Sequence, residues 1–358
     1  MKGYAKPLNE FICGQQIQFV IPVYQRNYDW LQDNCDQLLS DLIKLSHSGR
    51  TSHFFGSIVT SVAGTGFSRL VIDGQQRLTT ISLLLLAGIK AVNDGLLEIS
   101  NESRKDEAYD LFLNAKYCNS ERKIKLVPIE NDRIAYDKIF NGEDELDEDS
   151  KITRNFRHFY DKLTRKPQQL TFDNLLDAIE HLQIISIELD ADDDAQLIFE
   201  SLNSTGLALT EADKIRIYLL MSLTAEEQQL CFKNYWQKIE AATENNPTKF
   251  LRDYLTIKQQ LQRPVRLSNI YFEWKKYMDG HDRKQEMVEM LDYAQYYQQV
   301  TEAQMPTSKL SAKMRHICNI ESDVTNVFFI QFLKYAATNN LSYDEIDKVI
   351  DVVENYLA

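Results

Sequence analysis

The stretch RLVIDGQQRLTT, residues 69–80, joins a short apolar run to a long one through an abrupt turn at Gly74. Residues 70–72 predict a β-strand, and the helical spacing of the apolar residues that follow predicts a helix over about residues 75–92. From residue 78 to residue 89 there is no charged side chain, which indicates a helix buried on almost all sides. The stretch therefore predicts a strand, a turn and a central helix.

The turn has the chemistry of an anion site. The first N–H groups of a helix lack intrahelical partners and carry about half a positive charge. Gly74 would let a ligand approach the backbone, and Arg77 offers a guanidinium fork suited to phosphate. Asp73 can orient an arginine, hold a ribose hydroxyl or ligate a metal ion. In the alternative, Asp73 caps the helix and Arg77 pairs with a carboxylate. We favour the site, because Gln75, Gln76 and Arg77 would need partners at the end of a buried helix.

The composition narrows the class of protein. The chain has 358 residues, enough for two or three domains, and a net charge of −13, which argues against a broad nucleic-acid surface but not against a local basic groove. Five cysteines form no CxxC pair, so neither a disulfide framework nor a zinc site is indicated. There is no signal peptide, and the apolar run at residues 83–87 is too short to span a bilayer. We expect a cytoplasmic protein that has no membrane contact.

A polar and aromatic loop, PVYQRNYDW at residues 22–30, precedes the central stretch. Loops between rigid elements often bind ligands. Arg26 would supply a second phosphate contact, and Tyr24 or Trp30 would stack on a base. The alternative is that both aromatic side chains are core anchors and that Arg26 is solvated.

Other elements flank this loop. Residues 15–21 and 53–62 predict strands, the second with Gly56 in its middle, where a glycine often marks a close approach. Residues 30–45 predict a helix capped by Asp29. No Walker A loop occurs, which excludes a P-loop enzyme.

Three blocks of the sequence resemble the N-terminal module of the GmrSD family, which comprises type IV, modification-dependent restriction systems and related phage-defence proteins. The blocks are IPVYQR at 21–26, FGSIV at 55–59 with DGQQRLTT at 73–80, and FESLNSTGLALTEAD at 199–213. Each block is weak alone, but together and in this order they are specific. The module is similar to the ParB/sulfiredoxin-like fold. The resemblance thus implies an α+β fold, with a small mixed sheet-and-helix module followed by a mostly α-helical domain.

The resemblance also implies a function. A nucleoside triphosphate, GTP or ATP with Mg²⁺, would bind and be hydrolysed at the motif, with Asp73, Gln76 and Arg77 as catalytic residues and Asp73 as the metal ligand. The residues expected to bind the nucleotide are Tyr24, Gln25, Arg26, Gly74, Gln75, Asn203 and Asp213. Hydrolysis would be coupled to the cleavage of modified phage DNA by an HNH nuclease domain or subunit.

The predicted organisation has four segments. They are a ParB-like nucleotide-binding module at 1–95, a helical insertion with an exposed acidic loop at 96–183, a strand and helix pair completing the cleft at 184–220, and a helical domain at 221–358. Thr210 and Asp213 are spaced as a capping box. No HNH signature occurs, so a truncated chain or a stand-alone subunit of a split system is expected.

Residues 252–284 interleave basic and aromatic side chains, which suits a nucleic-acid groove. The candidate DNA contacts are Arg263, Arg266, Lys275 and Lys276. The acidic balance favours the alternative, an amphipathic helix with core aromatics and solvated lysines. Two further functions stay open for the whole chain: a DNA-sensing module without nucleotide hydrolysis, and a ParB-like metal-dependent nuclease. A homodimer is also compatible with the sequence.

Overall fold

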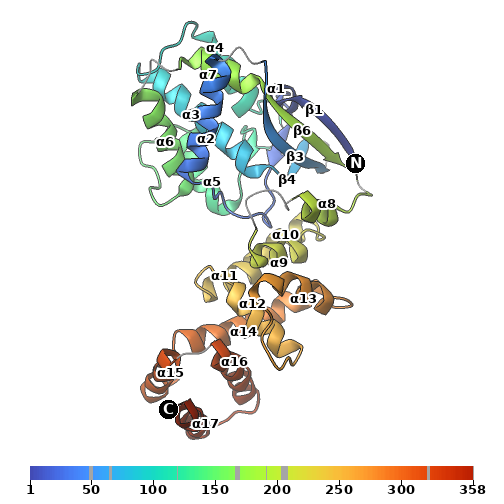
Figure 1. The fold of residues 1–358 in the computed structure, drawn as a ribbon, viewed down its shortest axis with the longest axis vertical. Coiled ribbons are helices and arrows are strands. Elements are labelled where there is room, and N and C mark those ends of the chain that lie inside the picture. Colours follow the sequence, from blue (N-terminus) through green and yellow to red (C-terminus); the bar gives the residue numbers. More distant parts are fainter. Residues whose placement is uncertain are drawn as a thin grey trace. The chain divides into compact units, whose positions relative to one another are not determined.

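The computed structural model describes residues 1–47, 51–63, 67–118, 120–165, 170–190, 192–202, 209–320 and 323–357 (Figure 1). The chain divides into two compact units, Met1–Asn203 and Ser204–Ala358. The first unit is α+β and the second is mostly helical, as the sequence predicts. The predicted segment 184–220 is divided by this boundary.

The first unit is built on a six-stranded mixed sheet with the strand order β1-β6-β3-β4-β2-β5. Its strands are β1 (Lys2–Pro7), β2 (Gln18–Val20), β3 (His53–Ala63), β4 (Ser68–Asp73), β5 (Leu126–Val127) and β6 (Leu182–Leu189). β3 lies near the centre, antiparallel to β4 and parallel to β6. The strands predicted at 53–62 and 70–72 are confirmed, and the strand predicted at 15–21 is reduced to three residues.

Helices cover this sheet (Figure 1). They are α1 (Leu8–Ile12), α2 (Gln32–His47), α3 (Gln75–Asn93), α4 (Ser103–Ala108), the π-helical η1 (Tyr109–Leu113), α5 (Glu130–Phe140), α6 (Lys151–Arg165), α7 (Phe172–Glu180) and α8 (Ala195–Leu202). Fifteen of the nineteen residues of α3 are buried, which confirms the predicted central helix. Burying each of its leucines stabilises the unit by about 1.5–3 kcal/mol.

The start of α2 corrects one prediction. The helix begins at Gln32, and Asp29 is not its N-cap. The side chain of Asn34 instead accepts the Leu31 N–H at 3.0 Å, while Asp29 pairs with Lys151 of α6. The carboxylate of Asp29 therefore connects its loop to α6 instead of capping α2.

The second unit consists of helices. They are α9 (Glu211–Leu220), α10 (Ala225–Cys231), the π-helical η4 (Phe232–Trp236), α11 (Gln237–Ala242), α12 (Thr248–Lys258), the 3-10 helix η5 (Leu267–Asn269), α13 (Ile270–Tyr277), α14 (Arg283–Thr301), α15 (Ser308–Ile320), α16 (Asp323–Thr338) and α17 (Tyr343–Leu357). Trp236 and Trp274 are fully buried in its core. The capping box of Thr210 and Asp213 is confirmed at the start of α9.

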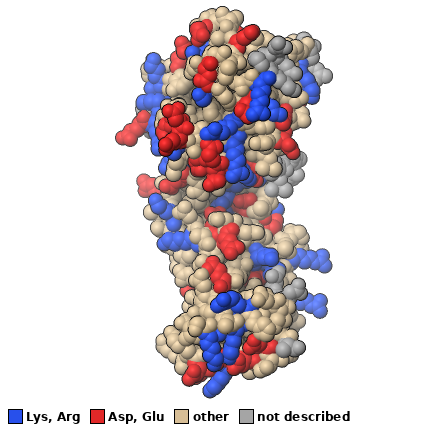
Figure 2. Space-filling model, turned by 90° about the vertical axis from the view of Figure 1, so that its left-hand side faces the viewer, with Lys and Arg blue, Asp and Glu red and all other residues tan. Residues whose placement is uncertain are grey.

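Acidic and basic side chains are interspersed on the face shown in Figure 2. Within the described residues, no helix combines the length and the apolar character that crossing a membrane would require. The exposed acidic loop predicted within residues 96–183 lies at residues 141–150, a largely exposed stretch of turns and bends.

Candidate functional site

The turn before α3 is built by close packing against β3. Gly74 is the N-cap of α3, with φ of 92°, and no side chain caps the helix. A Cβ at Gly74 would lie 3.0 Å from Cγ1 of Ile58 and 3.1 Å from the carbonyl oxygen of Ser57. Only glycine combines this left-handed backbone with such a contact at low cost. The side of the Gly74 Cα that would carry a Cβ therefore faces β3, and the approach of a ligand to the backbone at Gly74 stays a prediction.

Arg77 lies across β3 at Gly56. A Cβ on Gly56 would fall 2.7 Å from Nε of Arg77 and 2.8 Å from its Cζ, and Nη1 donates a hydrogen bond of 3.1 Å to the carbonyl oxygen of Ser57. The close approach predicted at Gly56 is thus that of the Arg77 guanidinium. This contact holds the arginine beside the first turn of α3 while its side chain stays half-buried.

Asp73 ends β4 next to two guanidinium groups. Burial raises the pKa of its carboxyl above the usual range, whereas the charge of Arg77, a hydrogen bond from the Gly74 N–H and the charge of Arg26 lower it. Arg26 is also 3.9 Å from a carboxylate oxygen of Asp29, and only 15% of its side chain is exposed. The structure therefore brings together the three charged residues that the sequence singled out: Asp73, Arg77 and Arg26.

Two glutamines connect the loop of residues 22–30 to the end of β4. Nε2 of Gln25 donates to the carbonyl oxygen of Ile72 at 2.7 Å, and Oε1 of Gln25 accepts from Nε2 of Gln75 at 3.1 Å. Gln25 is 3% exposed. Because these amides are buried, each lost partner would cost about 1–3 kcal/mol. Gln25 and Gln75 thus hold the backbone on which Arg26 is carried.

Gln76 binds the far end of the same loop. Its Oε1 accepts the N–H groups of Asp29 at 2.8 Å and Trp30 at 3.3 Å, and its Nε2 donates to the carbonyl oxygen of Asn27 at 3.1 Å. Both polar atoms of the amide are therefore engaged with backbone. This geometry supports a role for Gln76 in positioning the loop. A direct catalytic role of Gln76 stays a prediction.

The aromatic side chains Tyr24 and Trp30 of this loop pack into or against the hydrophobic core. Tyr24 is 1% exposed, and burial raises the pKa of its hydroxyl. Trp30 packs against the hydrophobic core, and its carbonyl oxygen accepts from Nδ2 of Asn155 at 2.9 Å. This arrangement favours anchoring over base stacking for both side chains.

A network that the sequence did not predict ties the loop to the helical layer. The hydroxyl of Tyr28 is 2.8 Å from Oγ1 of Thr80 and accepts from Nδ2 of Asn155 at 3.0 Å. The N–H of Tyr28 donates to Asp132 at 2.6 Å, and burial raises the pKa of Asp132 to about 6. In the sequence, Asn155 and Asp132 could have been noticed only as polar residues at inward-facing positions of their predicted helices.

The candidates Asp213, Arg263 and Arg266 belong to the second unit. Asn203 falls outside the described residues. Asp213, in the second unit, accepts from Thr210 in the capping box and pairs with Nη2 of Arg216 at 2.8 Å. Arg263 and Arg266 are exposed between α12 and η5. Among the described residues, no three His, Cys, Asp or Glu side chains gather as a metal site would require.

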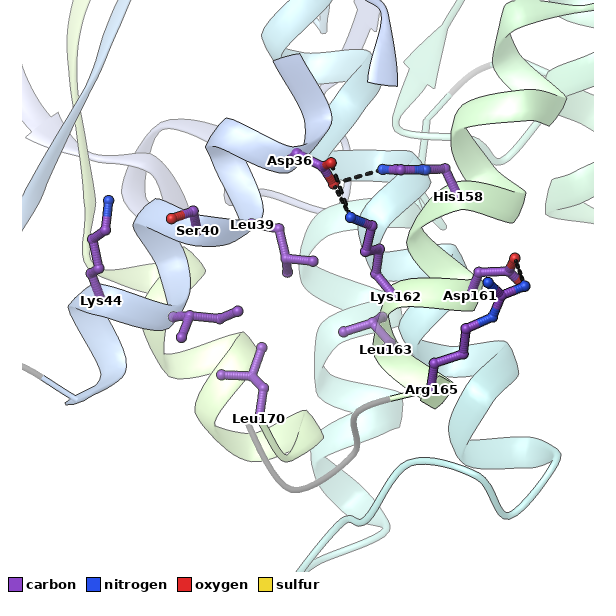
Figure 3. A pocket seen from close by; sticks show the side chains of 11 residues that line it. Asp36, Leu39, Ser40, Lys44, His158, Asp161, Lys162, Leu163, Arg165 and Leu170 are labelled. Carbon is purple, nitrogen blue, oxygen red and sulfur yellow. Dashed lines mark hydrogen bonds and ion pairs between the residues drawn. The ribbon is translucent and has the colours of Figure 1, made fainter. Parts of the chain in front are cut away.

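Figure 3 shows a separate cavity of about 820 Å³ in the first unit, lined by α2, α6 and Leu170. Asp36 accepts from Nε2 of His158 at 2.7 Å and from Nζ of Lys162 at 2.9 Å at its rim. None of the residues 73–77 lines it. The cavity therefore does not belong to the motif.

The fold and the charged cluster define an α+β module in which a helix begins without a side-chain cap and two guanidinium groups lie near Asp73, a combination that suits anions. Residues 8–220 match the family described as GmrSD restriction endonuclease, N-terminal domain. Because this match covers more than half of the chain, the protein belongs to that family and is a component of a restriction or defence system. No curated protein matches the chain. The whole motif and its supporting loop lie inside the matched region.

Proposed function

We propose that the first unit binds a nucleoside triphosphate, GTP or ATP, with its phosphates at the first turn of α3, and hydrolyses it to regulate an HNH nuclease. The nuclease acts on DNA, specifically modified phage DNA. The observation that carries the proposal is the gathering of Arg77 and Arg26 around Asp73, beside a helix start that has no side-chain cap.

The residues fit a polyphosphate. Each charge-assisted hydrogen bond from a guanidinium to phosphate contributes about 1.5–3 kcal/mol, and the N-terminus of α3 adds its dipole. Arg77 is held by β3, and Arg26 by the loop that Gln25, Gln75 and Gln76 fasten. Donors fixed before the substrate arrives stabilise developing charge without reorganisation.

Asp73 fits a Mg²⁺ ion that a nucleotide brings with it. Phosphate sites commonly hold Mg²⁺ through one or two carboxylates, and the phosphate oxygens and water complete the shell. When bound, the ion would neutralise charge on the phosphates. Asp73 is half-buried and the pKa of its carboxyl is raised, so a cation at this position would favour its charged form.

The experiment is phosphate release from GTP and from ATP, with and without Mg²⁺ and DNA, on the wild type and on Arg77→Ala. We expect Arg77→Ala to lose at least tenfold in nucleotide affinity or turnover. The matched control is Arg165→Ala, an exposed arginine of the same unit that pairs with Asp161. Wild-type turnover in a folded Arg77→Ala protein would contradict the proposal. Steeply salt-dependent DNA binding that no nucleotide alters, without phosphate release, would favour a DNA sensor instead.

A further inference from the structure

The second unit has a concave surface that combines cations with an exposed aromatic ring. The hollow measures about 570 Å³ and is lined by Tyr218 of α9, by Phe272, Lys275 and Lys276 of α13, by the turn at residues 278–281 and by Arg283 of α14. It lies wholly within one unit of the chain. Its volume is within the range of pockets that hold small ligands.

The charge of this hollow is locally positive although the chain is acidic. Three cationic side chains line it together with the carboxylate of Asp279, and Nζ of Lys276 also pairs with Oε1 of Glu273 at 3.0 Å. In the described part of the chain, Nη1 of Arg283 donates to the carbonyl oxygen of Tyr218 at 2.7 Å and to the hydroxyl of Ser222, neither of which neutralises its charge. The guanidinium is held with its Cζ 4.3 Å from the ring centre of Tyr218. An anion would find this cation already in place.

Phe272 is the unusual member of the set. It is 57% exposed in a surface that is otherwise polar, and Nζ of Lys276 lies 4.1 Å from its ring centre. Trp274 and Tyr254 of the same stretch are buried in the core, whereas the ring of Phe272 is open to solvent. A flat apolar face beside cations suits a ligand that carries both a ring and negative charge.

The turn at residues 278–281, which lines the hollow, borders open space at Gly280. Gly280 has φ of 80°, and a Cβ there would meet nothing within 4 Å. The rings of Tyr277 and His281 stack with their centroids 4.6 Å apart, which connects the two ends of the turn. The turn thus leaves open space beside Gly280.

We propose that this hollow binds single-stranded DNA, with phosphates against Lys275, Lys276 and Arg283 and an unpaired base on Phe272. A duplex buries the faces of its bases, whereas a single strand can offer one to an aromatic ring. The site is independent of the proposed nucleotide site. The hollow shares Lys275 and Lys276 with the sequence-based set of DNA contacts and adds Phe272 and Arg283. Arg263 and Arg266 do not line it, and their contact with DNA stays a separate prediction.

The test is fluorescence anisotropy of the full chain with a labelled oligothymidylate of about 12 nucleotides, near the site sizes of single-strand binders. With three phosphate contacts, the logarithm of affinity should fall against the logarithm of salt concentration with a slope of about −2. Lys275→Ala/Lys276→Ala should reduce that slope by more than half. Phe272→Ala should weaken binding about tenfold and leave the slope unchanged.

The chain offers matched controls. Lys233→Ala/Lys238→Ala removes two exposed lysines of the same unit outside the hollow, and Tyr343→Ala removes a ring with the same exposure as Phe272. These variants should bind the oligonucleotide as the wild type does. No binding by the wild type, equal losses in the control variants, or equal affinity for a duplex of the same length would overturn the proposal. Circular dichroism confirms that each variant is folded, and unchanged phosphate release in the Lys275 and Phe272 variants separates this site from the nucleotide site.

Discussion

The guanidinium of Arg77 rests on Gly56, so that a Cβ at residue 56 would fall 2.7 Å from Nε of the arginine. The central strand of the sheet therefore sets the position of the motif's cation. The Ser57 carbonyl next to Gly56 accepts from the same side chain. The motif at residues 73–77 thus depends on a strand that lies earlier in the chain.

Gly56→Ala should displace Arg77 without changing the motif itself. The methyl group collides with the guanidinium, and φ of 121° strains any residue other than glycine by about 1–3 kcal/mol. If Arg77 binds phosphate, nucleotide affinity should fall about as far as in Arg77→Ala. Isothermal titration with a nonhydrolysable nucleotide measures the effect.

Gly95→Ala is the control for that substitution, because Gly95 has φ of 72° and a Cβ there would meet nothing within 4 Å. It should lose stability to strain alone and keep its nucleotide affinity. A Gly56→Ala protein that binds nucleotide as Gly95→Ala does would show that the position of Arg77 is irrelevant to binding.

Gln76→Ala should loosen the loop of residues 22–30. It removes the partners of two N–H groups and one carbonyl, and we expect a loss of about 1–3 kcal/mol in the free energy of unfolding. Urea denaturation measures this loss. Gln37→Ala, which changes an exposed glutamine bonded to Asp41, should leave stability within about 0.5 kcal/mol. Full stability of Gln76→Ala, combined with lost turnover, would favour a direct catalytic role for Gln76 over a positioning one.

Asp132 should make stability depend on pH. Its folded-state pKa of about 6 lies above that of an exposed Asp, about 3.9, so the native state binds the proton more tightly. The resulting stabilisation is fully present below about pH 4 and is lost as the pH rises through 6. Asp132→Asn does not titrate and keeps an oxygen for the Tyr28 N–H. Relative to the wild type, it should gain roughly 1–3 kcal/mol between pH 4 and pH 7.5.

Urea midpoints of the Asp132→Asn variant and the wild type across that range provide the measurement. Asp144→Asn, in the exposed acidic loop, is the matched control and should follow the wild type at every pH. If the urea midpoints of Asp132→Asn and the wild type changed in parallel with pH, Asp132 would titrate as an exposed carboxyl does.

Asp213 and Glu227 form a natural pair for comparison. Each is the N3 residue of a capping box, Asp213 with Thr210 and Glu227 with Thr224. Each also pairs with a cation, Asp213 with Arg216 and Glu227 with Lys284. Replacing either by alanine should destabilise the second unit by about 1–2 kcal/mol, measured by thermal unfolding. The prediction that Asp213 also binds nucleotide requires a drop in nucleotide affinity in Asp213→Ala that Glu227→Ala does not share.

The parts of the fold that sequence reasoning predicted are those encoded by neighbours in the chain. The strand, the turn and α3 follow from a local apolar pattern interrupted at Gly74, and the cap of α9 follows from residues three positions apart. β1 and β5 were missed. KGYAKP, with its lysines, glycine and proline, shows no strand alternation, and Leu126–Val127 is too short to produce any pattern.

The candidate site divides in the same way. The charged residues Asp73, Arg77 and Arg26 could be selected by their chemistry, and they do lie together. The partners of Gln76 could not be selected, because they lie 46 to 49 positions earlier in the chain and are backbone groups without a signature of their own. The packing of Gly74 against β3 could not be predicted for the same reason, since that strand is distant in sequence.

The edges of the sheet bear on how copies of this protein meet. One edge strand, β5, has two residues, and the other, β1, carries Lys2, Lys6 and Pro7 in its six. Short or lysine- and proline-bearing edges are poor templates for an added strand from another molecule. Aggregation through cross-molecule β-pairing is therefore disfavoured, and any ordered self-association should use helical faces.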